Sequence, residues 1–87
     1  MKVYLIKNIE EYGKFIAYCI DHDINVWRLY WDEKEKGNIC YRIDWGNGRC
    51  FSSSKKYWED NGYEIVEPNF ILDEYGNKYK LGEKDIF

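Results

Sequence analysis

The spacing of apolar residues predicts an amphipathic helix near the N-terminus. Between Ile9 and Ile20, apolar side chains recur every three to four positions, which places them on one side of an α-helix. Asn8 can cap this helix, because Glu11 three positions later completes a capping box. We expect the helix to end near His22 with Tyr18 facing away from the sheet. The stripe expected to pack on the sheet is Ile9, Tyr12, Phe15, Ile16, Cys19 and Ile20.

Strict alternation of apolar and polar residues predicts two strands on either side of a charged loop. The strands are expected at residues 25–32 and 39–45. Gly46-Asn47-Gly48 predicts a hairpin turn into a further short strand at residues 49–51, because Asn and Gly tolerate positive φ. Matching the apolar faces of the first two strands requires three pairs: Trp31 with Ile39, Leu29 with Tyr41, and Trp27 with Ile43.

The remaining elements follow from turn and capping signals. A first strand is expected at residues 2–7, and a second, short helix at residues 52–61, capped by serine and stopped by Asn61-Gly62. A strand at 63–67 ends at Pro68, and a last hairpin covers 70–81. The order β-α-β-β-β-α-β-β-β predicts one α+β domain over residues 1–87, with a mainly antiparallel sheet and the first helix packed on one face.

Composition narrows the class of protein. Hydrophobic residues make up 45% of the 87 residues and the net charge is only −3, which excludes the composition of a disordered chain. Aromatic residues make up 20%, more than a small core hides, so we expect some rings at a contact surface. The apolar start is too short for a signal peptide, and three cysteines argue against a disulfide framework. These features predict a protein of the cytosol that binds no membrane.

The sequence contains no strong catalytic or metal-binding motif. Cys19, His22, Cys40 and Cys50 could in principle form a Cys₃His zinc site, but no C-x-x-C knuckle is present and buried thiols are the simpler interpretation. A three-residue hairpin loop would place Cys50 opposite Asp44, away from Cys40. The only histidine, His22, has no family-type nucleophile motif beside it, and the glycines of residues 46–48 open no helix that could cradle a phosphate. We therefore expect no enzyme activity, metal or cofactor.

Two sets of residues are candidate binding surfaces. The first is acidic and aromatic, and the absence of Lys and Arg between Lys56 and Lys78 would let it face a basic partner or act as ordinary solubility charge. Its members are Tyr57, Trp58, Glu59, Asp60, Glu64, Glu67, Asp73 and Glu74. The second is the face of the expected strands that carries Arg28, Tyr30 and Arg42, which could grip a phosphate or base, or form cross-strand ion pairs with aspartates.

Two segments resemble small proteins of phages and mobile elements in low-GC bacteria, anti-CRISPR proteins among them. They are Asn61-Gly62-Tyr63-Glu64-Ile65-Val66 and Asp73-Glu74-Tyr75-Gly76-Asn77-Lys78-Tyr79-Lys80-Leu81, 15 of the 87 residues. The resemblance implies inhibition of a host defence protein by binding, and it assigns no particular residue a role.

Two functions therefore stand as expectations. The first is a non-catalytic inhibitor that docks on a host defence protein, such as a CRISPR effector, through the acidic and aromatic set. The alternative is a sponge that sequesters a signalling nucleotide through Arg28, Tyr30 and Arg42 at an oligomer interface. Direct binding of nucleic acid is not expected, since the sequence shows no basic stripe to hold phosphates.

Overall fold

The computed structural model describes residues 1–83 of the chain, and within them it is a mixed α+β fold, as predicted. Residues 84–87 of the expected 1–87 domain lie outside the described part. The elements, in chain order, are β1 (Lys2–Leu5), α1 (Ile9–Asp21), the short 3₁₀ helix η1 (Glu33–Glu35), β2 (Ile39–Asp44), β3 (Arg49–Ser54), α2 (Lys55–Asp60), β4 (Glu64–Val66), β5 (Pro68–Leu72) and β6 (Tyr79–Glu83).

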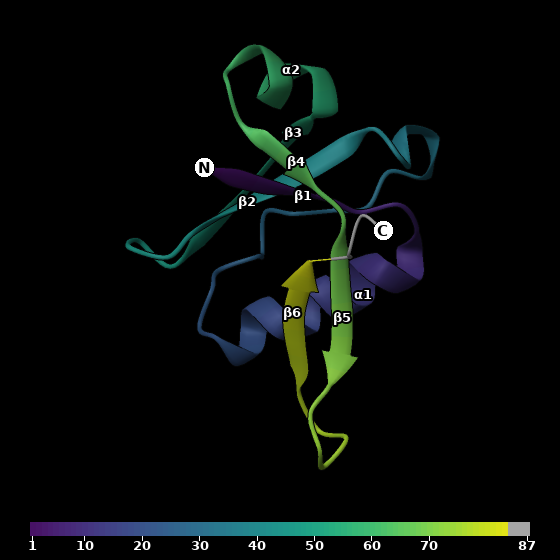
Figure 1. Cartoon of the computed structure of the whole chain (residues 1–87), viewed down its shortest axis with the longest axis vertical. Coiled ribbons are helices and arrows are strands. Elements are labelled where there is room, and N and C mark those ends of the chain that lie inside the picture. Colours follow the sequence, from purple (N-terminus) through teal and green to yellow (C-terminus); the bar gives the residue numbers. More distant parts are fainter. Residues whose placement is uncertain (84–87) are drawn as a thin grey trace.

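The strands form two sheets. The larger sheet has the order β3-β2-β1-β4, and its pairs are antiparallel except for β1 and β4, which run parallel. Strands β5 and β6 form a separate antiparallel ribbon that packs beside α1 (Figure 1). Between β1 and β4 the chain forms α1, β2, β3 and α2, and it then returns to pair with β1 in the parallel direction. Strand β3 is left as a free edge of the larger sheet.

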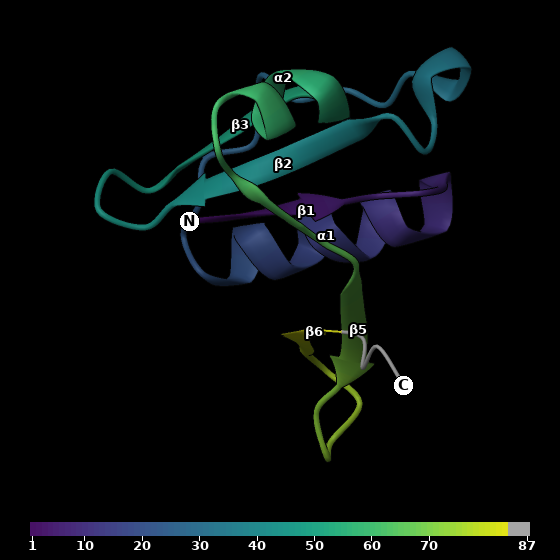
Figure 2. The ribbon, with the colours of Figure 1, turned by 45° about the horizontal axis from the view of Figure 1, so that its top comes forward.

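Helices cover both faces of the larger sheet, with α1 on one side and α2 on the other (Figure 2). Alternation along β2 divides its side chains between the two cores. Tyr41 and Ile43 pack with Phe15 of α1, whereas Cys40 packs with Trp58 of α2. Strand β2 is therefore buried on both faces, as expected for a strand inside a sheet that is covered on both sides.

Helix α1 begins as the sequence predicts, but its buried face differs from the predicted stripe. The amide of Glu11 donates to Asn8 Oδ1 at 2.8 Å, which is the expected N-cap bond. Phe15 and Cys19 are fully buried, whereas Ile9 and Ile20 are 54% and 62% exposed. Tyr18, expected to face away, is buried: its ring packs against Trp45 and His22. The sheet covers only the middle of the helix, and the hairpin loop shields Tyr18.

The predicted strand at residues 25–32 is wrong. Only Asn25 pairs, through one parallel bridge to Arg49, and the chain then turns. The reason is competition for β2: Tyr41 already pairs with Tyr4 on one side and Ser52 on the other, so none of the three predicted pairs forms. The apolar side chains of this segment instead pack against the α1 core from the side. These side chains are Val26, Leu29 and Trp31, and Trp31 lies 5.5 Å from Tyr12 between ring centroids.

The β2–β3 hairpin forms where predicted, but its loop has four residues, 45–48. Asp44 therefore pairs with Arg49, and Cys50 lies opposite Ile43 instead of Asp44. Asp44 sets this longer loop, because its carboxylate accepts hydrogen bonds from the Asn47 amide at 3.3 Å and side chain at 2.8 Å. Trp45 is consequently part of the loop and is 54% exposed.

The second helix is shorter than the predicted 52–61. Ser52 and Ser53 belong to β3, where they pair with Tyr41 and Cys40. Ser54 is the N-cap, since its hydroxyl accepts from the amide of Tyr57 at 3.1 Å. The predicted stop is confirmed: Asn61 is the C-cap, and the next residue, Gly62, has φ +79°.

Candidate binding groove at the edge strand

The chain contains three arginines, and all three lie around Phe51 on the edge strand β3. Arg42 is opposite Phe51 in the β2–β3 pair, and its guanidinium carbon lies 4.9 Å from the centroid of the Phe51 ring. Arg28 and Arg49 line a hollow that also includes Phe51. These arginines come from a loop, from a central strand and from the edge strand, so only the folded chain brings them near the same part of β3.

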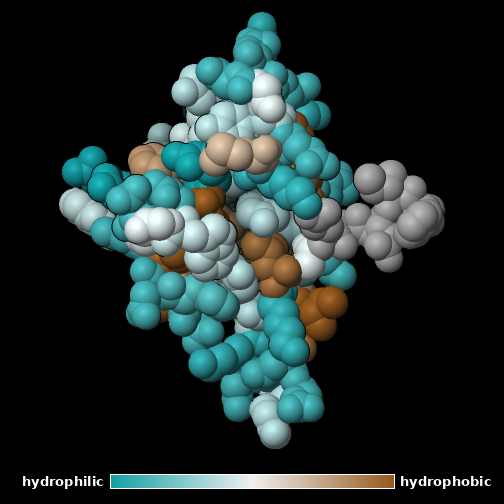
Figure 3. Space-filling view, turned by 60° about the vertical axis from the view of Figure 1, so that its left-hand side comes forward, coloured by the Kyte–Doolittle hydropathy of each residue, from teal (hydrophilic) through white to brown (hydrophobic). Residues whose placement is uncertain are grey.

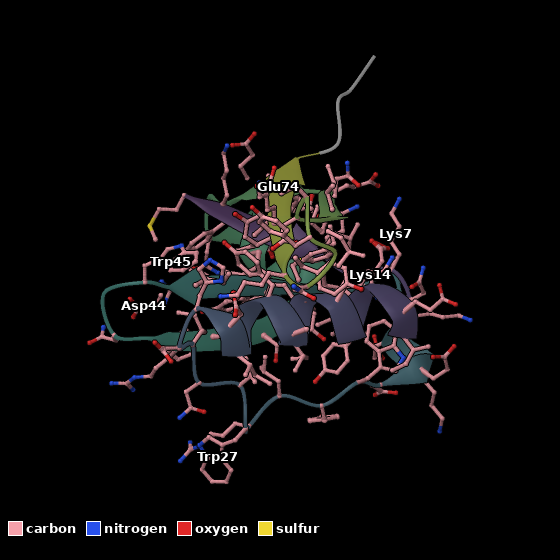
Figure 4. The ribbon with its side chains drawn as sticks, turned by 90° about the horizontal axis from the view of Figure 1, so that it is seen from below. Lys7, Lys14, Trp27, Asp44, Trp45 and Glu74 are labelled. Atoms are coloured by element: carbon pink, nitrogen blue, oxygen red, sulfur yellow. The ribbon has the colours of Figure 1, made fainter. Side chains whose placement is uncertain are left out.

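The larger hollow, here called the edge groove, lies between the free edge of β3 and the loop at residues 25–29. It has a volume of about 460 Å³ and is lined by Asn25, Trp27, Arg28, Leu29, Arg49, Cys50, Phe51 and Ser52. The groove opens because Asn25 bends the loop away from β3, its side-chain oxygen accepting from the amide of Trp27 at 3.1 Å. Trp27 is 75% exposed and points away from the body of the molecule (Figure 4). The guanidinium carbon of Arg28 lies 5.5 Å from its ring centroid.

The backbone of β3 adds a hydrogen-bond donor to this groove. The amide of Cys50 points outward, because it donates to the carbonyl of Asn25 at 3.3 Å. Backbone groups of alternate residues in a strand point to the same side, so the N–H and C=O of Ser52 also face the free edge. Past Asn25 the loop leaves the strand, and the edge at Ser52 is open to a ligand.

A second hollow, here called the face hollow, lies on the α2 side of the sheet. It measures about 300 Å³ and is lined by Arg42, Phe51, Ser52, Ser53, Tyr57, Trp58 and Tyr63. The rings of Tyr57 and Tyr63 lie 5.1 and 4.8 Å from that of Trp58 between centroids, so the α2 side of the hollow is aromatic. Nε of Arg42 is buried and has no hydrogen-bond partner. An unpaired buried donor of this kind is unusual in a folded protein.

The arginines make no direct ion pair in the described part of the chain. Within residues 1–83, the ion pairs are made by lysines and His22, and none of them joins an arginine to a carboxylate. The carboxylate of Asp44 interacts with the charge of Arg42. Hydrogen bonds from Asn47 lower the pKa of Asp44, and the charge of Arg42 lowers it further. In a chain of net charge −3, three arginines therefore lie close to one edge of the larger sheet.

The acidic and aromatic set predicted from the sequence does not form one surface. Glu59 and Asp60 lie on α2, while Asp73 and Glu74 lie in the β5–β6 turn at the opposite end of the molecule (Figure 1). Asp73 also has a structural role, because its carboxylate accepts from the amides of Tyr75 and Asn77 at 3.0 and 2.9 Å. These bonds lower the pKa of Asp73.

Other members of that set are occupied by the fold. Trp58 is 5% exposed, and its indole N–H donates to the carbonyl of Cys40 at 3.0 Å. Glu67 pairs with Lys7, and Asp60 pairs with Lys56 across one turn of α2. Tyr57, Glu59 and Glu64 remain exposed near α2. On the face drawn in Figure 3, hydrophilic residues predominate and hydrophobic residues show as separate patches.

The alternative set, Arg28, Tyr30 and Arg42, is partly brought together. Arg28 lines the edge groove and Arg42 lines the face hollow, and Phe51 lines both. Arg42 lies in β2, whereas Arg28 lies in a loop, so the two residues do not belong to strands that pair with each other. Tyr30 is 76% exposed and lines neither hollow. Sequence reasoning missed Arg49, Phe51 and Trp27. Arg49 and Phe51 stand at alternate positions after a hairpin turn, which was a signal that they share a side of the new strand.

The sheet separates the cysteines considered for a zinc site. Cys19 and Cys50 lie in the core under α1, whereas Cys40 lies in the core under α2. His22 is at the end of α1, with Nδ1 2.9 Å from the carbonyl oxygen of Tyr18. Among residues 1–83, no group of three or more His, Cys, Asp or Glu side chains is placed to hold a metal ion.

The described residues form a small α+β fold with an arginine-lined groove at the edge of its larger sheet. No family model, no curated protein and no solved structure matches the chain. Neither helix of residues 1–83 has the length and apolar character needed to cross a membrane.

Proposed function

We propose that this chain is a non-catalytic binding protein that captures a nucleotide in the edge groove. The observation that carries the proposal is that Arg28 and Arg49 line the edge groove beside the exposed ring of Trp27, in an acidic chain, and neither arginine forms an ion pair within residues 1–83. Guanidinium groups bind phosphate oxygens through paired N–H groups. If the protein is present in amounts comparable to a signalling nucleotide, binding keeps that nucleotide away from its receptors.

The rings of the groove favour a nucleotide over a bare phosphate. Trp27 and Phe51 are 75% and 38% exposed beside Arg28 and Arg49, and an exposed ring gives a base a surface on which to stack. The groove volume of about 460 Å³ falls within the range of small-ligand sites. The outward N–H of Ser52 adds a donor for a phosphate oxygen.

Binding without turnover is supported by the chemistry of the lining. The residues that line the groove supply guanidinium, amide, hydroxyl, thiol and apolar groups, but no carboxylate or imidazole for general acid–base catalysis. The thiol belongs to Cys50, which is buried. A hydrogen bond with Cys19 and burial both raise the pKa of Cys50, which disfavours the reactive thiolate.

The test is isothermal titration calorimetry of the whole chain with adenosine and guanosine 5′-monophosphates (AMP and GMP) at low salt. We expect saturable binding, weaker for adenosine, which lacks the phosphate. The double variant Arg28→Gln/Arg49→Gln should lower affinity about tenfold or more, the effect of one lost charge-assisted hydrogen bond. Its matched control is Lys34→Gln/Lys80→Gln, which removes the same charge at exposed positions outside both hollows. Absence of binding, or equal loss in both variants, contradicts the proposal.

Docking on a host defence protein is the second candidate function. It is supported by the exposure of Tyr57, Glu59 and Glu64 around α2, and by the resemblance to phage-type proteins. Its test is inhibition of DNA cleavage by a purified CRISPR effector nuclease, before and after charge reversal at Glu59 and Glu64. We expect inhibition that the reversal weakens; inhibition unchanged by the reversal would exclude this surface.

A further inference from the structure

The edge groove and the face hollow meet at the edge strand. Phe51 and Ser52 line both of them, so the two hollows adjoin along β3 at these two residues. Arg28 and Arg49 lie on one side of this junction, and Arg42 lies on the other. A ligand that fills the edge groove can therefore continue past Phe51 into the face hollow.

The face hollow repeats the chemistry of the edge groove. Arg42 supplies a guanidinium group that rests on the Phe51 ring, with a buried Nε that has no acceptor. Tyr57 is 50% exposed on the far wall, and Tyr63 is half-buried beside it. One guanidinium with exposed rings is again a set that holds a phosphate and stacks on a base.

We infer that the ligand is a dinucleotide, with one nucleotide in the edge groove and the second in the face hollow. This inference rests on the proposed function, because it extends the same site. A mononucleotide in the edge groove leaves Arg42 and the two tyrosines unused. Joining two nucleotides makes the second contact intramolecular, so a dinucleotide gains affinity over either half when the spacing suits both hollows.

The experiment compares AMP with the linear dinucleotide pApA, both carrying a 5′-phosphate, in calorimetric titrations of the whole chain. We expect pApA to bind at least about tenfold more tightly than AMP, as one further stacked base allows. Arg42→Gln should remove that advantage and leave the affinity for AMP unchanged. Tyr57→Ala, which changes a half-exposed ring, should reduce the advantage in the same way, so the result does not depend on how well the Arg42 variant folds.

The outcomes separate this inference from the proposed function. If the native protein binds AMP and pApA equally, or if both variants keep the advantage of pApA, the face hollow is not a second subsite and the inference fails while nucleotide capture stands. If neither AMP nor pApA binds, both fail. Loss of the pApA advantage in both variants, with AMP binding intact, supports the dinucleotide.

Discussion

Substitution of Trp58 by phenylalanine tests whether this residue holds the fold together or serves a partner. Trp58 was expected at a binding surface, but it is 5% exposed and packs with Val3, Leu5 and Cys40 under α2. Its indole N–H donates to the carbonyl of Cys40 at 3.0 Å, a buried bond that joins α2 to β2. Phenylalanine keeps an aromatic ring there but lacks the donor.

The magnitude follows from two losses. Losing this hydrogen bond costs about 0.5–1.5 kcal/mol, because the Cys40 carbonyl keeps its partner Ser53 in the β2–β3 ladder. The smaller ring also leaves a void, at about 24 cal/mol per Å³ of cavity that the neighbours do not fill. Together we expect about 1–3 kcal/mol, a substantial part of the roughly 4–13 kcal/mol typical of a domain of this length. The melting temperature should fall by at least about 4 °C.

The matched control is Trp27→Phe, the same chemical change at a ring that is 75% exposed. A substitution there should alter the free energy of unfolding by less than about 0.5 kcal/mol. Urea unfolding followed by far-ultraviolet circular dichroism measures both variants without relying on tryptophan fluorescence. Equal unfolding midpoints for the two variants would refute the structural role, and would return Trp58 to the list of possible contact residues.

Two further predictions concern backbone conformation and alkaline stability. Gly13→Ala should stabilise the chain by about 0.5–1 kcal/mol, because a helical Cβ there meets nothing within 4 Å; Gly62→Ala, in equally open space but at φ +79°, should cost about 1–2 kcal/mol. A gain at both positions in urea titrations would contradict this assignment of the α2 stop. Burial raises the pKa of Cys40 to about 11 from an ordinary value near 9, so between these values only the unfolded chain loses the proton and the free energy of unfolding falls as pH rises. Thermal melts from pH 7 to 11 should show this decline, less steeply in Cys40→Ala, and an identical slope in that variant would rule out this thiol as a source.

Features set by residues close together in the chain could be predicted well. The cap of α1 needs only Asn8 and the amide of Glu11, and the stop of α2 needs only Asn61 and Gly62. These interactions span three or four positions, so the local sequence contains both partners. The α+β class and the β2–β3 hairpin followed from the same kind of signal.

The sheet order could not be predicted, because it depends on competition between strands for the same edges. Residues 25–32 alternate as a strand does, yet β1 and β3 occupy both edges of β2, and the segment folds against the α1 core. The parallel pairing of β1 with β4 joins segments about 60 residues apart, and no local pattern records it.

The candidate site shows the same division. The sequence by itself determined that the chain has three arginines, many rings and an acidic balance, and that Arg42 and Arg49 flank a hairpin. Only the tertiary structure decided that Arg28 joins them around Phe51 and that Asp73 and Glu74 lie far from α2. The physical reason is that a binding surface is made by side chains from different elements, and their meeting depends on which sheet edge stays open and where each loop leaves it.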